Sequence, residues 1–244
     1  MTVKLGSNLP SEKTGMTRRT HARIAGFTML FYMAIGVTVM ILMNRATDTE
    51  GTAAILARIA EHASDVRVAI LLELLEAFSA VVLAVALYAI TRGESHEFAM
   101  FAMLCRVGEG VLGVVGLRNT LGLLWLATAG AGAGGPDPTT ANRLGDYLLM
   151  PSRSAMNMGG LFFAVGSMIF SYLLLRGRIV PASLALVGVI ASILLVLGLP
   201  LQIAGLLTGP VSGYLWLPMV AFQISLGLWL LIKGVRTPTA NEAK

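Results

Sequence analysis

Four charged residues stand inside long apolar stretches of the sequence, and they are the first place to look for chemistry. Glu73 and Glu76 lie in one stretch, and Arg106 and Glu109 lie in the next. Each pair has a spacing of three residues, which places both members on one face of a helix. A charged side chain at bilayer depth costs at least about 2.5 to 3.5 kcal/mol. These residues therefore mark a bundle interior, a cavity or a pathway.

The charges of this group do not balance, because three carboxylates accompany one guanidinium. Lowering the cost of this excess negative charge requires protonation of at least one Glu, a bound cation, access to water or another basic partner. The functional interpretation is a buried polar site that carries a proton or holds a cationic or hydrogen-bonding ligand. The structural interpretation is an interhelical Arg-Glu clasp, involving Arg106 and Glu109, that fixes helix packing, and Glu73 can instead reach the outer interface. Arg118 is expected to extend to the outer membrane surface.

Three further polar residues, Gln202, Gln223 and Asn157, also fall within or at the start of apolar segments. Side chains of this kind form interhelical hydrogen bonds more often than ligand contacts. They are secondary candidates for the same polar site.

The motifs of catalysis and metal binding are missing from the sequence. Its three histidines, His21, His62 and His96, lie in connections and form no HExxH or similar ligand cluster. The glycine-rich stretch 130–135 is not followed by the Lys-Ser/Thr pair of a phosphate-binding loop. We therefore predict no metal site, no cofactor and no catalytic residues, and an intramembrane enzyme that uses a buried Glu is the least supported class.

The elements that hold these residues are predicted to be transmembrane helices. The chain is 56% hydrophobic and 13% charged, with a mean hydropathy of +0.77, whereas soluble domains are about 25% charged. A membrane-spanning helix needs about twenty mainly apolar residues. The fold class is therefore all-α, a polytopic bundle of six transmembrane helices at approximately 24–43, 66–90, 98–117, 156–175, 182–206 and 214–232. Residues 1–20 and 237–244 are predicted to be cytoplasmic tails, the first of them disordered, on either side of a 21–236 transmembrane domain.

The Lys and Arg residues predict the orientation, because cytoplasmic loops retain positive charge. With the amino terminus inside, eleven of the eighteen Lys and Arg residues lie on the inner side and five on the outer side. Both termini are then cytoplasmic. The net charge of +5 reflects basic residues that set the orientation in the membrane, so nucleic acid is not an expected partner.

The two outer connections differ in character. Residues 49–67 have apolar residues at helical spacing between charged ones, which predicts a short amphipathic helix at the interface. Residues 129–154 contain a glycine-rich run and a Pro-Asp-Pro sequence, which predicts a loop. Gly110, Gly113 and Gly116 are predicted to allow close packing of the third helix.

The second and third segments are expected to be antiparallel neighbours, since only a short turn joins them. At a rise of about 1.5 Å per residue, Glu76 lies about 21 Å and Glu109 about 16 Å from the inner edge. Both are near the midplane, where their charged faces can meet.

Several short motifs carry a resemblance to a known family. They are Ala22-Arg23-Ile24-Ala25-Gly26, Ala86-Leu87-Tyr88, Cys105-Arg106-Val107-Gly108-Glu109-Gly110, the basic turn 175–181 that ends in Pro, and the carboxyl-terminal 229–236. Together they resemble the bacterial integral-membrane family catalogued as domain of unknown function 4386, from about Thr20 to Arg236. The resemblance implies a six-helix protein without an assigned reaction, in a bacterial cytoplasmic (inner) membrane. Glu73 and Glu76 are not part of the family pattern.

Two functions from different classes remain open at this stage. The first is binding or transport of a small solute, ion or lipophile through a polar midplane site between the second and third helices. The second is a structural or regulatory membrane protein that binds a partner protein, with the buried charges serving packing only. The expected partners are the lipid bilayer, a small-molecule ligand, and a further copy of the chain or another membrane protein.

Overall fold

The structure is a computed structural model of the 244-residue chain, and it describes residues 16–129, 135–207 and 211–235. For residues 150–157, 211 and 212 it describes the backbone alone. The described residues form eight α-helices and no strand: α1 Arg18–Thr47, α2 Thr52–Glu61, α3 Ala63–Thr91, α4 His96–Ala129, α5 Pro138–Arg176, α6 Ala182–Ile203, α7 Val211–Tyr214 and α8 Leu217–Ile232. The predicted tails lie mostly outside the described residues.

Five helical stretches within the described residues are long and apolar enough to cross a membrane. They are α1, α3, α4, the Met158–Arg176 part of α5, and α6. The predicted sixth segment, 214–232, corresponds to the shorter apolar helix α8 of 16 residues. The all-α class is thus confirmed, and the five apolar helices indicate a multi-pass membrane protein.

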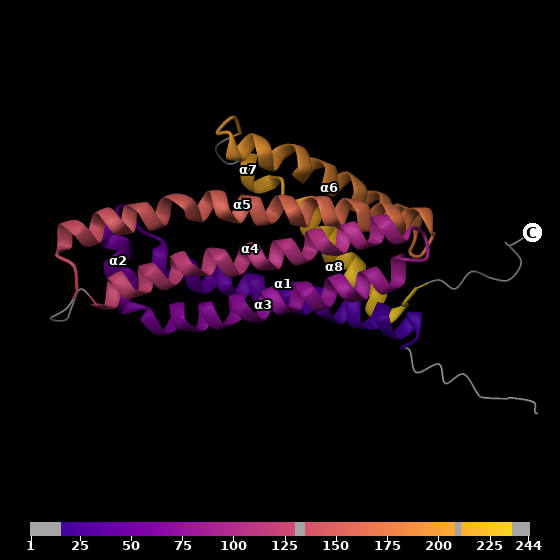
Figure 1. Cartoon of the computed structure of the whole chain (residues 1–244), viewed down its shortest axis with the longest axis horizontal. Coiled ribbons are helices and arrows are strands. Elements are labelled where there is room, and N and C mark those ends of the chain that lie inside the picture. Colours follow the sequence, from indigo (N-terminus) through magenta and orange to yellow (C-terminus); the bar gives the residue numbers. More distant parts are fainter. Residues whose placement is uncertain (1–15, 130–134, 208–210, 236–244) are drawn as a thin grey trace, which may run out of the picture.

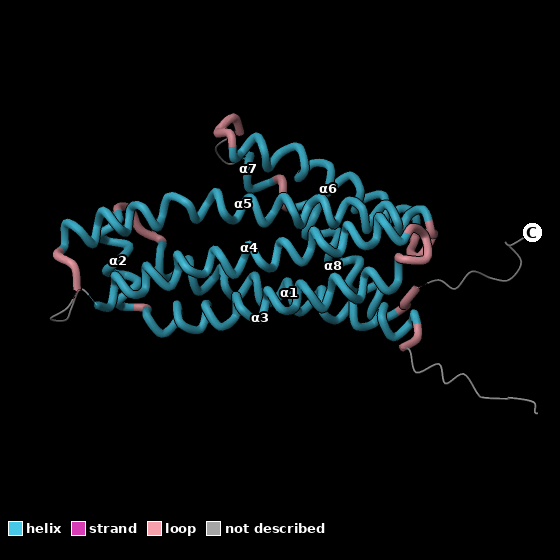
Figure 2. Tube along the Cα trace, viewed as in Figure 1, coloured by secondary structure: helices cyan, strands magenta, loops and turns pink. Residues whose placement is uncertain are grey.

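Helices α1, α3, α4 and α5 lie along one axis, and α6 is inclined to them (Figures 1 and 2). Helix α3 packs against α1 and α4, α5 packs against α4 and α6, and α8 packs against α1 and α6. The α3–α4 and α5–α6 turns lie at one end of the bundle, together with the start of α1 and the finish of α8. We call this the turn end. Helix α2 lies at the opposite end, which we call the α2 end.

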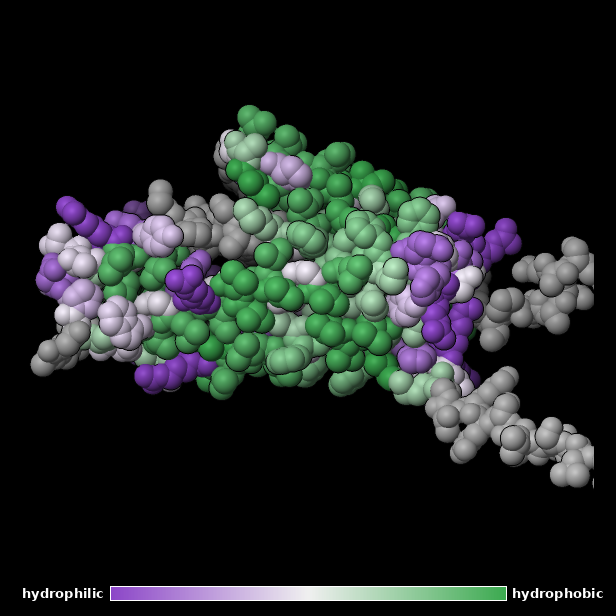
Figure 3. All heavy atoms as spheres, viewed as in Figure 1, coloured by the Kyte–Doolittle hydropathy of each residue, from purple (hydrophilic) through white to green (hydrophobic). Residues whose placement is uncertain are grey.

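The hydropathy of the surface changes along the same axis. On the face shown in Figure 3, hydrophobic side chains form a broad band across the middle of the molecule, and hydrophilic side chains gather at both ends. Large apolar side chains in the band are open to the surroundings, among them Phe78 at 70% exposure and Leu197 at 64%. Such a band is costly in water and fits a hydrocarbon environment.

The α2 end has a hydrophobic core of its own. Leu56 and Ile59 of α2 are buried against Val66 of α3 and Leu126 of α4, and Thr52 hydrogen-bonds to Asp146 of α5. The short helix predicted in 49–67 is therefore present, and its apolar face packs on the bundle.

The loop predicted over residues 129–154 is wrong for most of its length. Helix α4 runs to Ala129 and α5 begins at Pro138. Asp137 caps α5 by accepting hydrogen bonds from the backbone N–H groups of Thr139 at 3.0 Å and Thr140 at 3.1 Å. The hydrogen bonds from Thr140 hold the pKa of Asp137 below its usual range. Pro138 suits the first position of a helix, since its missing N–H would have no partner there.

Length explains why that helix was not predicted. Helix α5 has 39 residues and is about 58 Å long, and α4 has 34 residues and is about 51 Å long. Both exceed a hydrocarbon layer of roughly 30 Å, so their ends at the α2 end need not be apolar. The polar residues for which the sequence predicts a loop belong largely to the part of α5 that extends beyond the hydrocarbon layer.

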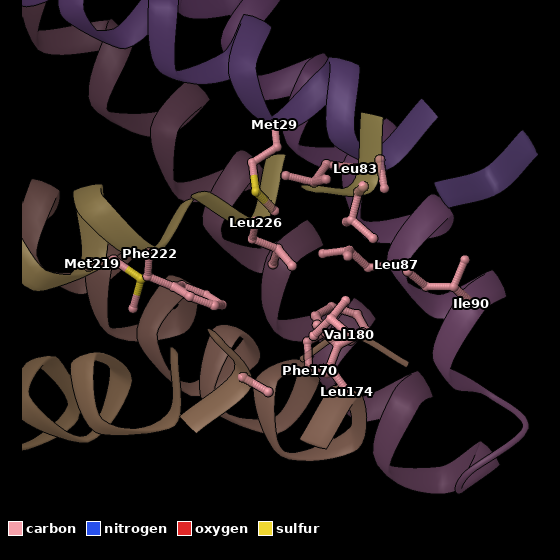
Figure 4. Close-up of a cluster of buried hydrophobic side chains, with 14 of the residues drawn as sticks. Met29, Leu83, Leu87, Ile90, Phe170, Leu174, Val180, Met219, Phe222 and Leu226 are labelled. Atoms are coloured by element: carbon pink, nitrogen blue, oxygen red, sulfur yellow. The ribbon is translucent and has the colours of Figure 1, made fainter. Parts of the chain in front are cut away.

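The main core lies toward the turn end (Figure 4). It joins α1, α3, α5, α6 and α8 through residues such as Met29, Leu83, Phe170 and Leu226. A close contact of α1 with α8 supports it. A Cβ added at Gly26 of α1 would lie 2.5 Å from the backbone nitrogen of Leu231 and 2.6 Å from the carbonyl oxygen of Gly227.

The predicted glycine face of α4 is confirmed at one position and wrong at two. A Cβ at Gly110 would lie 3.1 Å from the carbonyl oxygen of Ala77 in α3. One at Gly113 or Gly116 would meet nothing within 4 Å. A spacing of three advances about 300° per step, so successive glycines drift around the helix, away from α3.

Candidate functional site

Arg106 is the largest fully buried side chain of the described residues, at 1% exposure. Its Nη1 atom lies 2.6 Å from Oε2 of Glu109, one turn further along α4. The two groups form an ion pair by distance, although the N–H bonds do not point at the oxygen well enough for a hydrogen bond. The expected clasp between helices is therefore wrong for this pair, because Arg106 and Glu109 pair with each other within α4, about 15 Å from its start.

Aromatic residues from two other helices complete this pair. The hydroxyl of Tyr32 in α1 donates a hydrogen bond to Oε1 of Glu109, 2.7 Å away. The guanidinium carbon of Arg106 lies 5.5 Å from the ring centroid of Tyr32 and 4.7 Å from that of Phe163 in α5. Both distances suit cation–π attraction. The guanidinium is thus held between two aromatic rings and one carboxylate.

Glu76 of α3 lies beside this group and against α1. Its Oε1 atom is 2.9 Å from the place that a Cβ of Gly36 would occupy, so the missing side chain of Gly36 makes room for the carboxyl. The charges of Glu109, Glu73 and Arg106 all act on this carboxyl. Within the described residues its carboxyl has no hydrogen bond or ion pair.

Glu73 lies one turn from Glu76 on the same face of α3, on the side of the α2 end. It is half-buried, and its carboxyl likewise has no ion pair within the part of the chain that the structure describes. The four predicted residues therefore come together, but only Glu109 has a cation within salt-bridge distance.

Sequence reasoning placed the site between α3 and α4, and it missed the contribution of α1 and α5. Tyr32 offered a weak signal, because it lies about 21 Å from the start of α1, whereas tyrosines of membrane proteins favour the interfaces. Phe163 and Gly36 offered none, since their roles depend on how α5 and α1 cross the other helices.

The secondary candidates lie in different places. Gln223 of α8 is buried at 7% exposure and lines a cavity together with Arg106. Gln202 lies in the last turn of α6, a helix that packs on α5 and α8. Asn157 lies in α5, and its side chain is outside the described part of the structure. Gln223 therefore adjoins the charged group.

Residues 24–234 match a family described as Domain of unknown function (DUF4386). The chain belongs to this family. The resemblance expected from the short motifs is thereby confirmed, and all of Glu73, Glu76, Arg106 and Glu109 lie within the matched range. No curated protein and no solved structure matches the chain. Membership in DUF4386 names no reaction, so the function has to be argued from the site.

The cavity beside Arg106 has a volume of about 20 Å³. It lies between α1, α3, α4, α5 and α8, and its lining combines four polar residues with apolar ones: Arg106, Ser167, Ser171 and Gln223 with Met29, Leu83, Leu87, Phe170, Leu174, Phe222 and Leu226. A cavity needs about 10 to 15 Å³ to hold one water. In this DUF4386 protein the polar space next to the charges is therefore of the size of a water molecule.

Tyr32→Phe tests the hydrogen bond that joins α1 to the ion pair. We expect the free energy of unfolding in detergent to fall by about 1.5 kcal/mol, because Oε1 of Glu109 loses its donor in an apolar interior. The matched control is Tyr172→Phe on α5, whose side chain is exposed. Equal stability of the two variants would contradict a role of Tyr32 in the site.

Proposed function

We propose that this protein crosses the membrane six times and reversibly binds a proton at Glu76, in the charged group that also contains Glu73, Arg106, Glu109 and Tyr32. Proton binding there would serve movement of an ion or a small solute across the membrane. The observation that carries this proposal is the second carboxyl beside an ion pair that is already complete, at a depth where lipid surrounds the bundle.

Glu76 has no ion pair of its own among the described residues. Nη1 of Arg106 lies 2.6 Å from Oε2 of Glu109, so the positive charge of Arg106 mainly neutralises that carboxylate. A second ionised carboxylate in the same apolar region meets the repulsion of Glu109 and loses its hydration. A proton on Glu76 removes both costs without requiring more space. Release of that proton requires water or a conformational change. A site with this requirement can couple proton binding to a movement of the protein.

The size of the polar space favours a proton over a larger ligand. A cavity of about 20 Å³ admits one water, whereas pockets for small organic molecules measure about 300 to 1,000 Å³. Of the solute, ion and lipophile considered from the sequence, an ion of the smallest kind fits best in this conformation.

The six-crossing topology rests on α8 and on the distribution of charge. Helix α8 is about 24 Å long, and a short span is accommodated by local thinning of the bilayer and by flanking residues that reach the interface. Basic residues at the turn end come from several elements: Arg18, Arg19, Arg23, Arg92, Arg176, Arg178 and Lys233. We infer that the turn end is cytoplasmic and that the membrane is the cytoplasmic membrane of a bacterium.

Labelling with dicyclohexylcarbodiimide tests the proton site. This apolar reagent adds to a protonated carboxyl in an apolar setting, and the adduct rearranges to a stable N-acylurea without a leaving group. We expect labelling of the purified protein at Glu76, found by peptide mass spectrometry, and a fall in labelling as the pH is raised. Glu76→Gln should abolish it.

Glu97→Gln is the matched control, because Glu97 is an exposed carboxyl in the first turn of α4. It should leave the labelling of Glu76 unchanged. If Glu76 stays unlabelled over the whole pH range in which the protein is folded, or if labelling does not depend on pH, the proposal is wrong. Labelling confined to Glu73 would overturn the assignment to Glu76.

A structural role is the alternative, and the short Arg106–Glu109 distance favours it for that pair. In this case the pair fixes the order of α1, α4 and α5, and a partner protein would bind elsewhere on the surface. Stability would then depend on Arg106, and no carboxyl of the group would change its protonation in the folded protein.

A further inference from the structure

We propose that water reaches the charged group from the turn end, through the cavity lined by Arg106, Ser167, Ser171 and Gln223. This inference rests on the proposed function, because it names the route by which the proton of Glu76 would exchange. It assigns a role to residues of α5 and α8 that the proton site itself does not use.

The first observation is the state of the Arg106 guanidinium. Apart from the ion pair of Nη1 with Glu109, none of its three nitrogens has a hydrogen-bond acceptor among the groups of the described chain, although the residue is 1% exposed. A guanidinium carries five N–H donors, and a buried donor without a partner costs about 1 to 3 kcal/mol. Such a group is stable when water satisfies it, and buried waters commonly have this role.

The second observation is that the guanidinium borders a space with further hydrogen-bonding groups. The cavity of about 20 Å³ is lined by Arg106 of α4, Ser167 and Ser171 of α5, and Gln223 of α8. A buried water needs about two to four polar partners, and in this mostly apolar lining these four side chains are the ones that can supply them. A wholly apolar cavity of this size would remain dry, so the lining decides the occupant.

The third observation is where the cavity lies along the bundle. Arg106 is about 15 Å from the start of α4 at the turn end. Leu87 is about 6 Å from the last residue of α3, and Leu174 is about 3 Å from the last residue of α5. The cavity therefore belongs to the half of the bundle next to the turn end. Ser171 is one helical turn closer to that end than Ser167.

Apolar side chains close the remaining distance. Figure 4 shows Met29, Leu83, Leu87, Phe170, Leu174, Phe222 and Leu226 in one cluster near the turn end, and all seven line the cavity. A short movement of such side chains admits water without a change of the backbone. The proposed route is thus a small, mainly apolar cavity with a few polar groups, and its apolar lining limits the rate of proton exchange.

The proton transfer along this route is balanced at each step. A water or serine hydroxyl accepts a proton on its oxygen and releases another one to the next oxygen, so no group gains charge permanently. Arg106 stays protonated, since its guanidinium does not lose a proton in proteins. Its part is to bind water with its free donors, because Arg106 lines the cavity and also lies beside Glu109.

Silver-ion accessibility of single cysteines tests the route. Cys105 is the one cysteine of the chain, so Cys105→Ala gives a background without thiols. Ser167→Cys and Ser171→Cys are made in it, with Ser192→Cys of α6 as control. Ser192 is buried at 0% exposure, donates to the carbonyl oxygen of Gly188 and does not line the cavity. A thiol that binds silver releases its proton and no longer reacts with a fluorescent maleimide added in detergent.

The expected result is that the cysteines at 167 and 171 bind silver at least about tenfold faster than that at 192, because a dry site must first open locally. The reaction should be fast only when silver nitrate is added on the membrane side of the turn end. Gln223→Leu, which removes a polar group from the lining, should slow the reaction at both positions.

Two results would overturn the route: equal rates at 167, 171 and 192, or fast reaction only from the side of the α2 end. These outcomes are separate from the test of Glu76. Carbodiimide labelling of Glu76 with no silver access at 167 and 171 would remove the route and retain the proton site. Silver access without labelling of Glu76 would retain a hydrated cavity and remove the proposed function.

Discussion

Arg106→Leu is expected to lower the free energy of unfolding by about 3 to 5 kcal/mol, the cost of leaving one buried ion without its partner. The substitution removes the cation 2.6 Å from Oε2 of Glu109, while the carboxyl stays in the interior. It also removes the guanidinium from between the rings of Tyr32 and Phe163. Reversible unfolding of the purified protein in mixed micelles, followed by circular dichroism, measures the change.

Glu109→Leu and the double variant complete the cycle. Replacing both members of a buried pair by apolar residues of similar size is often neutral or stabilising. We therefore expect Arg106→Leu/Glu109→Leu to recover most of the stability that either single variant loses. Arg118→Leu is the matched control on the same helix, because its side chain is exposed, and it should change stability by less than about 0.5 kcal/mol.

The cycle also separates the proposed function from the structural alternative. If the charges serve packing only, the double variant is as stable as the wild type and Glu76 shows no pH-dependent labelling in either protein. If Glu76 is the proton site, its labelling persists in the double variant but its dependence on pH changes, since the charges of Glu109 and Arg106 no longer act on it. A double variant as unstable as the sum of both single variants would show that the two residues do not act as a pair.

The charged residues of the site were predictable because a charged side chain is costly in lipid and is therefore rare there without a role. A Glu or Arg inside an apolar run is visible in one sequence, and spacing along a helix decides which charges share a face. The short α3–α4 connection then brings the two faces together. Tyr32, Phe163 and Gly36 were not predictable in this way, because each is ordinary in a membrane helix and gains its role from the position of a neighbouring helix.

The extent of the helices was predicted less well than their existence. Hydropathy marks the part of a helix that contacts lipid, and it says little about a continuation into water. Helix α5 therefore appeared as a loop up to Ser154, although Asp137 and Pro138 form a good start for it. The local capping signal was present in the sequence, and the glycine-rich stretch before it dominated the interpretation.

Helix contacts were the weakest part of the sequence interpretation, and the glycines show why. The regular spacing of Gly110, Gly113 and Gly116 suggested a packing face, but only Gly110 contacts another helix closely. The tightest contact at a glycine of α1 lies at Gly26, opposite Gly227 of α8, two residues about 200 positions apart. No local pattern can predict such a pair, because it depends on the crossing of the first and last helices.

Gly26→Ala is expected to lower the free energy of unfolding by about 3 kcal/mol, at the upper end of the usual cost of overpacking. The new Cβ would lie 2.5 Å from the backbone nitrogen of Leu231 and 2.6 Å from the carbonyl oxygen of Gly227. Both atoms belong to backbone, so α1 and α8 must separate, whereas a flexible side chain would simply move aside. The same unfolding measurement in mixed micelles gives the value.

Gly113→Ala is the matched control, since it makes the same chemical change in α4 where a Cβ meets nothing within 4 Å. It should be neutral or stabilising by up to about 1 kcal/mol, because Ala is the better helix former. The two variants share the propensity gain, so their difference isolates the contact of α1 with α8. If Gly26→Ala were as stable as Gly113→Ala, the first and last helices would not be in close contact, and Gln223 of α8 would lose its place beside Arg106.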